Sequence, residues 1–200
     1  MDVFCGIGGN TIQFALNPRC KRVIALDIDP NAIWCAKRNC ERYGVGGKVE
    51  FLQMSFFEWG KVGMDDRPEA NVVFCSPPWG GPSYKSLKVF NVDKIEPYGF
   101  GVVWEEALKA LKPCISTTYT DTNTKIAKLG FFMPRTSDLN QFAGYVDKLD
   151  PTGSGLEKGK GKGKALGATV AAKVIHYTLS GKSKGLCFYV DVPVMTSVGK

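Results

Sequence analysis

Histidine, paired cysteines and long apolar runs are all scarce in this chain. One histidine, His176, among 200 residues cannot build a histidine-rich metal site. The seven cysteines are scattered without a C-x-x-C pair, so neither a zinc site nor a disulfide framework is expected, and reduced thiols are typical of the cytosol or nucleus. No apolar run reaches the roughly 18 residues of a membrane span, and the amino-terminal residues lack the pattern of a signal peptide. We therefore expect neither a metal nor a membrane partner.

The overall composition is that of a folded domain with a basic second half. Hydrophobic residues make up 44% and charged residues 22%, which is typical of a globular protein, and the length suits a single domain over 1–200. The net charge of +7 lies mostly in residues 101–200, where 14 Lys and Arg face 8 Asp and Glu. Such a balance favours a polyanionic partner such as RNA. Part of it comes from "EKGKGKGK", inside an expected flexible insertion over 150–170, which is either a passive linker or an RNA-binding arm.

Hydrophobic spacing predicts alternating strands and helices. Strands are expected at 3–4, 22–29, 49–53, 71–76 and 129–133, and helices at 10–17, 31–43, 102–111 and 138–146. Two further strands, 171–179 and 185–193, flank a hairpin turn. The alternation indicates an α/β fold, a Rossmann-like sheet that is mostly parallel, with an antiparallel strand added by the terminal hairpin.

A glycine-rich turn follows the first expected strand, in "DVFCGIGGN" at residues 2–10. Glycines there allow a ligand to approach the backbone closely, but Thr11 replaces the third glycine of the dinucleotide fingerprint, which disfavours a nicotinamide dehydrogenase. Asp27 ends the next strand, where an acid can bind both hydroxyls of a ribose. Asp2, ahead of the turn, could bind the amino group of a cofactor's amino-acid part. The first half therefore predicts a site for a nucleoside-containing cofactor.

A second constellation, "SPPWGGP" at residues 76–82, ends a strand at the edge where α/β sheets bind ligands. The Ser76 hydroxyl and the carbonyl groups around Pro77 are acceptors, as a target –NH₂ group requires, and Trp79 offers a flat face for a planar ring. We interpret this turn as a clamp for an aromatic amine. The alternative is a rigid loop over which Trp79 simply packs.

The [D/N/S]-P-P-[Y/F/W] pattern after a glycine-rich half resembles amino-group methyltransferases that use S-adenosylmethionine. With "RVIALDIDPNAI", "EPYGF" and "FFMPR" in this order, the chain resembles the trimethylguanosine synthase family over about residues 2–145. That resemblance implies a class I methyltransferase fold and S-adenosylmethionine as cofactor. It also implies capped RNA as partner, with methylation of the 2-amino group of the 7-methylguanosine cap of small nuclear and nucleolar RNAs. A monomer in the nucleus, the nucleolus and the cytoplasm is expected.

The resemblance also assigns residues. Those implied to hold the cofactor are Asp2, Cys5, Gly6, Gly8, Asn10, Asp27, Ile28, Ser55 and Phe56. Those implied to hold the amine, the methylated base and the cap phosphates are Ser76, Pro77, Trp79 and Arg135. A cationic base on an indole face gains about 1–2 kcal/mol, which would favour methylated over plain guanosine caps, and an arginine fork suits phosphate.

The chain departs from the family at three places. Its first strand is very short and the helical segment that precedes it in the family is missing, so we expect a truncated chain, a fragmentary gene model or a degenerate enzyme. Ser55 stands where the family usually carries an acid, and the 150–170 insertion lengthens the connection to the hairpin. Two alternatives stay open: an amino-methyltransferase acting on another base or a protein amide, and an inactive domain that only binds caps or RNA.

Overall fold

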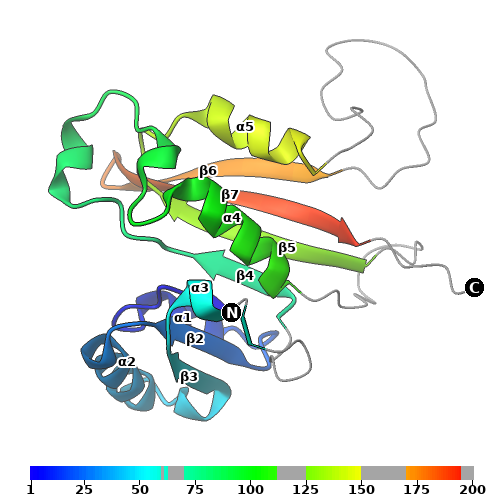
Figure 1. The fold of residues 1–200 in the computed structure, drawn as a ribbon. Coiled ribbons are helices and arrows are strands. Elements are labelled where there is room, and N and C mark those ends of the chain that lie inside the picture. The colour runs from blue at the N-terminus through cyan, green and yellow to red at the C-terminus, as the bar shows by residue number, and fades with distance from the viewer. Residues whose placement is uncertain (60, 63–69, 112–124, 150–169, 195–200) are drawn as a thin grey trace, which may run out of the picture.

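The computed structural model describes residues 1–59, 61–62, 70–111, 125–149 and 170–194. They form a sheet of seven strands in the order β3-β2-β1-β4-β5-β7-β6 (Figure 1). The strands are β1 (Asp2–Val3), β2 (Val23–Asp27), β3 (Val49–Gln53), β4 (Val72–Cys75), β5 (Lys125–Met133), β6 (Ala171–Leu179) and β7 (Lys182–Val194).

Five strands are parallel and the terminal hairpin is antiparallel. β1 is two residues long, yet it lies at the centre, paired with β2 through Asp2 and Ala25 and with β4 through Val3 and Cys75. β7 runs antiparallel to β5, and β6 is the outer strand. The expected mostly parallel sheet with an antiparallel hairpin is confirmed.

The longer helices lie where the spacing predicted them. They are α1 (Gly9–Leu16), α2 (Pro30–Arg42), α4 (Gly99–Ala110) and α5 (Leu139–Asp147), and the four-residue α3 (Phe56–Trp59) was not predicted. Among the residues that the structure describes, the 3₁₀ turns η1 (Gly46–Lys48), η3 (Pro82–Ser86) and η4 (Val92–Lys94) were also missed. The starts of α2 and α5 are fixed by Asp29 and Asp138, whose side chains accept the backbone N–H groups of Asn31 and Asn140.

The predicted position of the hairpin turn was wrong. Residues 180–185 were expected to form the turn, but it consists of Ser180 and Gly181 alone, with φ of 51° and 73°. Two successive left-handed residues match the twist of the flanking strands, so β7 starts earlier than expected, at Lys182. The expected 150–170 insertion lies outside the described residues, apart from its last residue.

An aromatic core occupies one face of the sheet, beneath α4 and α5. The rings of Phe131 and Phe188, from β5 and β7, are fully buried or nearly so, and Phe142 of α5 stacks on Phe188 with centroids 4.5 Å apart. On the other face α1 packs over the central strands, where Phe14 meets Phe74 edge-on at 5.2 Å. Layers of helices thus hold the carboxyl ends of β1, β2 and β4 rigidly at one edge.

Candidate cofactor and acceptor site

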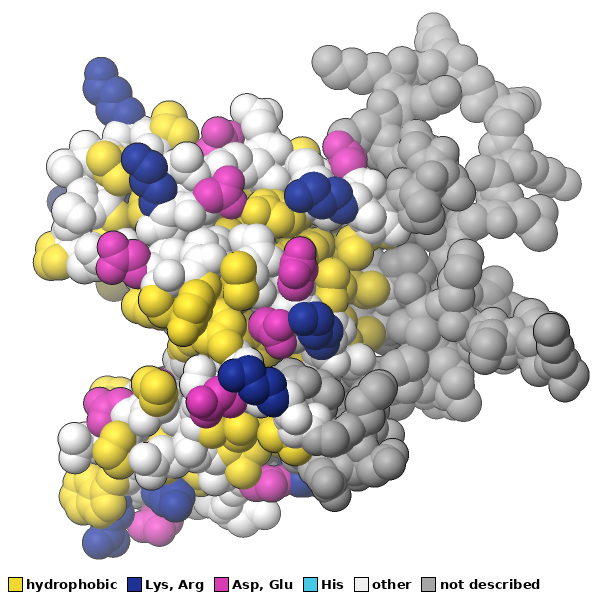
Figure 2. Space-filling view, in the orientation of Figure 1, with side chains coloured by type: hydrophobic (Ala, Val, Ile, Leu, Met, Phe, Trp, Pro, Cys, Tyr) yellow, Lys and Arg dark blue, Asp and Glu magenta, His cyan; other side chains and the backbone are white. Residues whose placement is uncertain are grey.

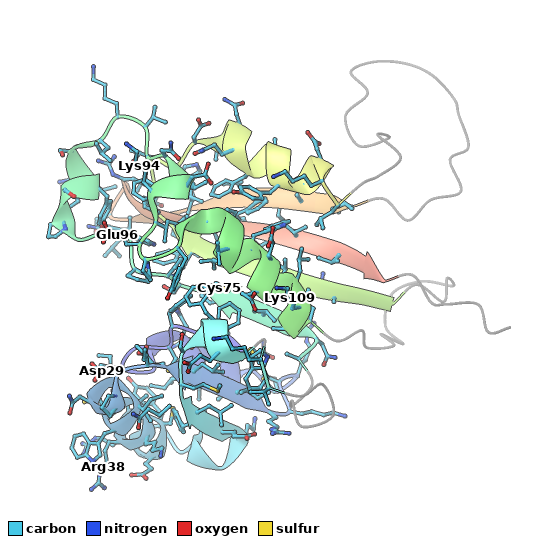
Figure 3. All side chains as sticks on the ribbon, in the orientation of Figure 1. Asp29, Arg38, Cys75, Lys94, Glu96 and Lys109 are labelled. Carbon is cyan, nitrogen blue, oxygen red and sulfur yellow. The ribbon has the colours of Figure 1, made fainter. Side chains whose placement is uncertain are left out.

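A pocket of about 410 Å³ opens at the carboxyl edge of the parallel strands. In Figure 2 the surface is hollowed between the part that carries α2 and the part that carries α4, and in Figure 3 Asp29 and Glu96 lie on either side of this opening. The pocket is lined by Phe4, Leu26, Asp27, Ile28, Met54, Ser55, Phe56, Phe57, Ser76, Pro78, Pro97 and Tyr98. Cofactor-side and acceptor-side residues predicted from separate motifs therefore share one cavity.

Asp27 is held in place by two backbone groups. Its Oδ2 accepts the N–H of Gly6 at 2.8 Å, and its Oδ1 accepts the N–H of Asp29 at 3.0 Å. Each carboxylate oxygen keeps a further lone pair, and the side chain is only half-buried at the pocket wall. The carboxylate is thus preorganised, with acceptor capacity left for the two hydroxyls of a ribose.

The glycines of the turn have two different physical roles. Gly6 has φ of +53°, and a Cβ there would meet nothing within 4 Å, so its backbone conformation requires glycine and leaves open space beside it. Gly8 has φ of +90°, and a Cβ there would lie 3.1 Å from the Cβ of Ala36. The absence of a side chain at Gly8 therefore allows α1 to pack closely against α2, in addition to any contact that Gly8 makes with a cofactor.

Asp2 is fully buried beneath the turn. Its Oδ2 accepts the hydroxyl of Thr11 at 2.5 Å, whereas its Oδ1 is buried without a hydrogen-bond partner. Burial raises the pKa of this carboxyl to about 6, and the negative charge of Asp27 adds to the rise. An orphan acceptor below the glycine turn fits a missing donor such as an ammonium group. Its role toward the amino group of a cofactor stays a prediction, since Asp2 does not itself line the pocket.

The other predicted cofactor residues divide into two groups. Ile28, Ser55 and Phe56 line the pocket, with Ile28 conspicuously exposed for an apolar side chain, at 69%. Cys5 and Asn10 do not line it. The Cys5 side chain instead packs with Ala25 and Ile33, and burial raises the pKa of its thiol to about 12.

Only part of the clamp lines the pocket. Ser76 lines the pocket, Pro77 is buried, and Trp79 lies just beyond Pro78, half-buried.

The indole of Trp79 is anchored at its edge. Its N–H donates to the carbonyl of Phe132 at 3.1 Å, and its ring centroid lies 4.9 Å from that of Tyr84, edge-on, and 5.3 Å from that of Phe132. Part of the ring is therefore packed, as in the alternative of a loop covered by Trp79, but the residue is not enclosed in the core.

Arg135 is exposed and lies outside the pocket. It follows β5 by two residues, so it stands at the same edge of the sheet as the Phe132 carbonyl that holds Trp79. Its predicted contact with cap phosphates is consistent with this place and stays a prediction.

Four aromatic or proline wall residues were not singled out from the sequence. They are Phe4, Phe57, Pro97 and Tyr98, of which Tyr98 is 55% exposed although its ring lies only 4.3 Å from that of Phe57. Phe4 has φ of 61°, a rare conformation for a bulky residue, directly before the glycine turn. Because they converge from three distant segments, only "EPYGF" gave a signal, as part of the family resemblance.

A second hollow, of about 460 Å³, lies at the opposite end of β3 beside α2, and none of the residues singled out from the sequence line it. Within the described ranges, no three His, Cys, Asp or Glu side chains gather as metal ligands. No helix in that same part of the chain has the length and apolar character needed to cross a membrane.

Solved structures establish the class of fold. The O-methyltransferase from Bacillus cereus, in complex with SAH, superposes with a TM-score of 0.55 at 14% identity over 94% of this chain and 71% of that one. An rRNA methylase from Streptococcus thermophilus gives a TM-score of 0.54 at 12% identity over 96% and 85%. The sheet order and these neighbours define a class I methyltransferase fold of the Rossmann-like type.

Sequence comparison then establishes the family. The model of RNA cap guanine-N2 methyltransferases matches residues 1–193, so the chain belongs to that family. It is 36% identical over 146 residues to the trimethylguanosine synthase of Schizosaccharomyces pombe, covering 72% of this chain and 54% of that protein. It is 29% identical over 203 residues to that of Saccharomyces cerevisiae, covering 98% and 54%. The chain thus spans about half the length of these curated relatives.

The buried carboxyl of Asp2 predicts a pH-dependent gain in stability on replacement by asparagine. The pKa of Asp2 rises from 3.8 to about 6 on folding. The protonated carboxyl therefore stabilises the folded state fully below pH 3.8, the pKa in the unfolded chain, and this stabilisation is lost as the pH rises through 6. A rise of this size costs about 3 kcal/mol at pH 8. Asp2→Asn keeps an acceptor for Thr11 and removes the charge. We expect its free energy of unfolding in urea to exceed the parent's by about 2–3 kcal/mol at pH 8.

The difference in the free energy of unfolding between Asp2→Asn and the parent should shrink steadily from pH 8 toward pH 4. An equal difference at pH 8 and pH 4 would contradict this account of Asp2. If Asp2 also receives the amino group of the cofactor, the more stable variant binds S-adenosylhomocysteine more weakly than the parent does. Stability and affinity then change in opposite directions, which a purely structural role does not produce.

Proposed function

We propose that this protein transfers a methyl group from S-adenosylmethionine to the exocyclic 2-amino group of a 7-methylguanosine RNA cap. One observation carries the proposal: Asp27 and Ser76, from independent motifs, line the same 410 Å³ pocket, which Pro78, the neighbour of Trp79 in the chain, also lines. Family membership and the two trimethylguanosine synthases support it. From the similarity to the trimethylguanosine synthases we propose capped small nuclear and nucleolar RNAs as substrates, and the nucleus, with its nucleolus, and the cytoplasm as places of action.

The residues present fit the cofactor. Asp27 offers preorganised acceptors for a ribose, Ile28 and Phe56 offer apolar surfaces for a flat base, and Asp2 has an unpartnered acceptor. Ser55 lines the same wall and can accept or donate one hydrogen bond. S-adenosylmethionine supplies, when bound, an electrophilic methyl group on a positively charged sulfur.

The clamp residues then act on the amine. An exocyclic amine is a poor nucleophile because its lone pair is delocalised into the ring. The two N–H groups of the amine would donate hydrogen bonds to the Ser76 hydroxyl oxygen and the Pro77 carbonyl, which turns the lone pair toward the pocket, while Trp79 holds the base flat. Positioning of this kind can supply up to about 7–11 kcal/mol, and the proton of the methylated amine passes to water afterwards. No histidine or carboxylate base is required.

Methyl transfer to cap analogues tests the proposal. We would incubate the chain with methyl-labelled S-adenosylmethionine and either 7-methyl-GTP or GTP, and locate the label by mass spectrometry. We expect label on the 2-amino group, and a kcat/KM about 5- to 30-fold higher for 7-methyl-GTP, from a cation–π gain of about 1–2 kcal/mol. Binding of the labelled donor without transfer to either nucleotide would refute the proposed activity and indicate a binding module.

A further inference from the structure

The β6–β7 hairpin has a one-sided charge that the proposed function does not use. Between residues 171 and 190 there is no Asp or Glu. The same stretch carries three lysines, all exposed: Lys173, Lys182 and Lys184. β6 is the outer strand of the sheet, and nearly all of its residues are exposed. β7 is mostly buried between Gly185 and Val190, and its one acid, Asp191, lies at the far end from the turn and pairs with Lys128. The exposed outer strand and the tip of the hairpin therefore carry lysines without an acid, a charge that is complementary to a polyanion.

A row of aromatic rings connects this hairpin to the clamp. From Trp79 the row passes to Phe132, with centroids 5.3 Å apart, and from Phe132 to Tyr177 at 6.4 Å. The hydroxyls of Tyr177 and Tyr189 lie 2.8 Å apart, and the Nζ of Lys173 is 5.7 Å from the centroid of the Tyr189 ring. Aromatic rings interleaved with lysines are the elements of a surface for single-stranded nucleic acid.

The hairpin also extends beyond the edge where the cap site lies. β5 ends at Met133, which pairs with Leu186, so residues 182–185 continue past the end of β5. Arg135 follows two residues after Met133, and the indole N–H of Trp79 donates to the carbonyl of Phe132, the last residue but one of β5. The lysines of the hairpin tip thus lie at the same edge of the sheet as the proposed cap site.

We propose that this hairpin face binds the RNA chain that follows the cap, with a base stacked on Tyr177 and phosphates along Lys173, Lys182 and Lys184. The inference rests on the proposed function, because the cap fixes the 5′ end of the RNA beside Trp79. Tyr177 is 44% exposed, which leaves ring surface for stacking. Exposed Ile175 and Leu179 would also suit a protein partner, but three lysines, with no acid between residues 171 and 190, favour RNA.

Comparison of a short and a long substrate tests this surface. The acceptors are 7-methyl-GTP and a capped oligoribonucleotide of about ten nucleotides, whose single-strand contacts give a salt slope of about −0.7 per phosphate. For the parent, we expect tighter binding of the capped oligonucleotide than of 7-methyl-GTP. The triple variant Lys173→Ala, Lys182→Ala, Lys184→Ala should bind the capped oligonucleotide about tenfold more weakly than the parent. The magnitude of its salt slope should be smaller by about 2, and its KM for 7-methyl-GTP should be unchanged. Tyr177→Ala should reduce the affinity for the capped oligonucleotide about fivefold and leave the KM for 7-methyl-GTP unchanged.

The matched control removes three exposed lysines from the amino-terminal half, Lys21, Lys37 and Lys61, at the same cost in net charge. The hairpin is not an RNA surface if both triple variants bind the oligonucleotide with equal affinity. The same conclusion follows if the hairpin variant is weakened as much toward 7-methyl-GTP as toward the oligonucleotide. Fluorescence anisotropy of the capped oligonucleotide measures binding to this surface without any methyl transfer. Failure of the parent to methylate 7-methyl-GTP would therefore overturn the proposed function while the hairpin is still judged by binding.

Discussion

Trp79→Ala is expected to abolish the preference for a methylated cap. The N–H of the indole donates to the carbonyl of Phe132, and Trp79 directly follows Pro78, which lines the pocket together with Ser76. We propose that its face receives the cationic base. Loss of a cation–π contact of about 1–2 kcal/mol should bring the ratio of kcat/KM for 7-methyl-GTP over GTP from about 5–30 down to near one. Initial rates with both acceptors measure this ratio.

Trp34→Ala is the matched control, because Trp34 is an exposed tryptophan of α2, 61% exposed, with the Arg38 guanidinium 5.6 Å from its ring. It should leave the ratio unchanged. The affinity of Trp79→Ala for S-adenosylhomocysteine should stay within about threefold of the parent's, since Trp79 does not line the pocket. An equal loss of cofactor and cap binding would contradict a stacking role and indicate that the indole only supports the loop.

Asp27→Asn is expected to weaken binding of S-adenosylhomocysteine at least about 100-fold. Hydrogen bonds to a charged acceptor are worth about 1.5–3 kcal/mol each, and a ribose makes two of them. The carboxylate also accepts the N–H of Gly6, so an amide in its place disturbs the glycine turn. Isothermal titration calorimetry gives the affinity, and a thermal melt shows whether the fold is kept.

Asp29→Asn provides the control for this variant. Asp29 is two residues further on and caps α2 by accepting the N–H of Asn31, a role that asparagine fills equally well. Its affinity should match the parent's. The 2′,3′-dideoxy analogue of S-adenosylhomocysteine tests the contribution of the ribose hydroxyls. The parent should bind this analogue more weakly than S-adenosylhomocysteine. The Asp27→Asn variant should bind the two ligands with equal affinity. A full penalty for the missing hydroxyls in the variant would show that Asp27 does not bind ribose.

The buried strands and the longer helices could be predicted from the sequence because local physics decides them. β2 is an unbroken apolar run ended by Asp27, and α2 is signalled by its own cap, Asp29-Pro30. The hairpin turn was misplaced because lysines and serine after Gly181 have the composition of a loop. In the sheet they form β7, since pairing with β6 outweighs their weak strand preference.

The site could be predicted only where a single segment carries it. Asp27 and Ser76 each end a strand, and the ends of parallel strands meet at one edge, so their convergence follows from the fold. Residues such as Phe57 and Tyr98 reach the pocket through an unpredicted short helix and through the loop before α4. Cys5 shows the converse: it lies in the right motif, but the left-handed backbone of Phe4 breaks the strand alternation, and the Cys5 side chain packs against Ala25 and Ile33.

The structure of the chain with S-adenosylhomocysteine and 7-methyl-GTP tests the central claim most directly. The account predicts the adenosine beside Asp27 in the 410 Å³ pocket, and the methylated base flat on the indole of Trp79. It further predicts the 2-amino nitrogen of that base within hydrogen-bonding distance of the Ser76 hydroxyl, facing the sulfur. A base seated away from Trp79, or an amine facing away from the sulfur, would contradict it.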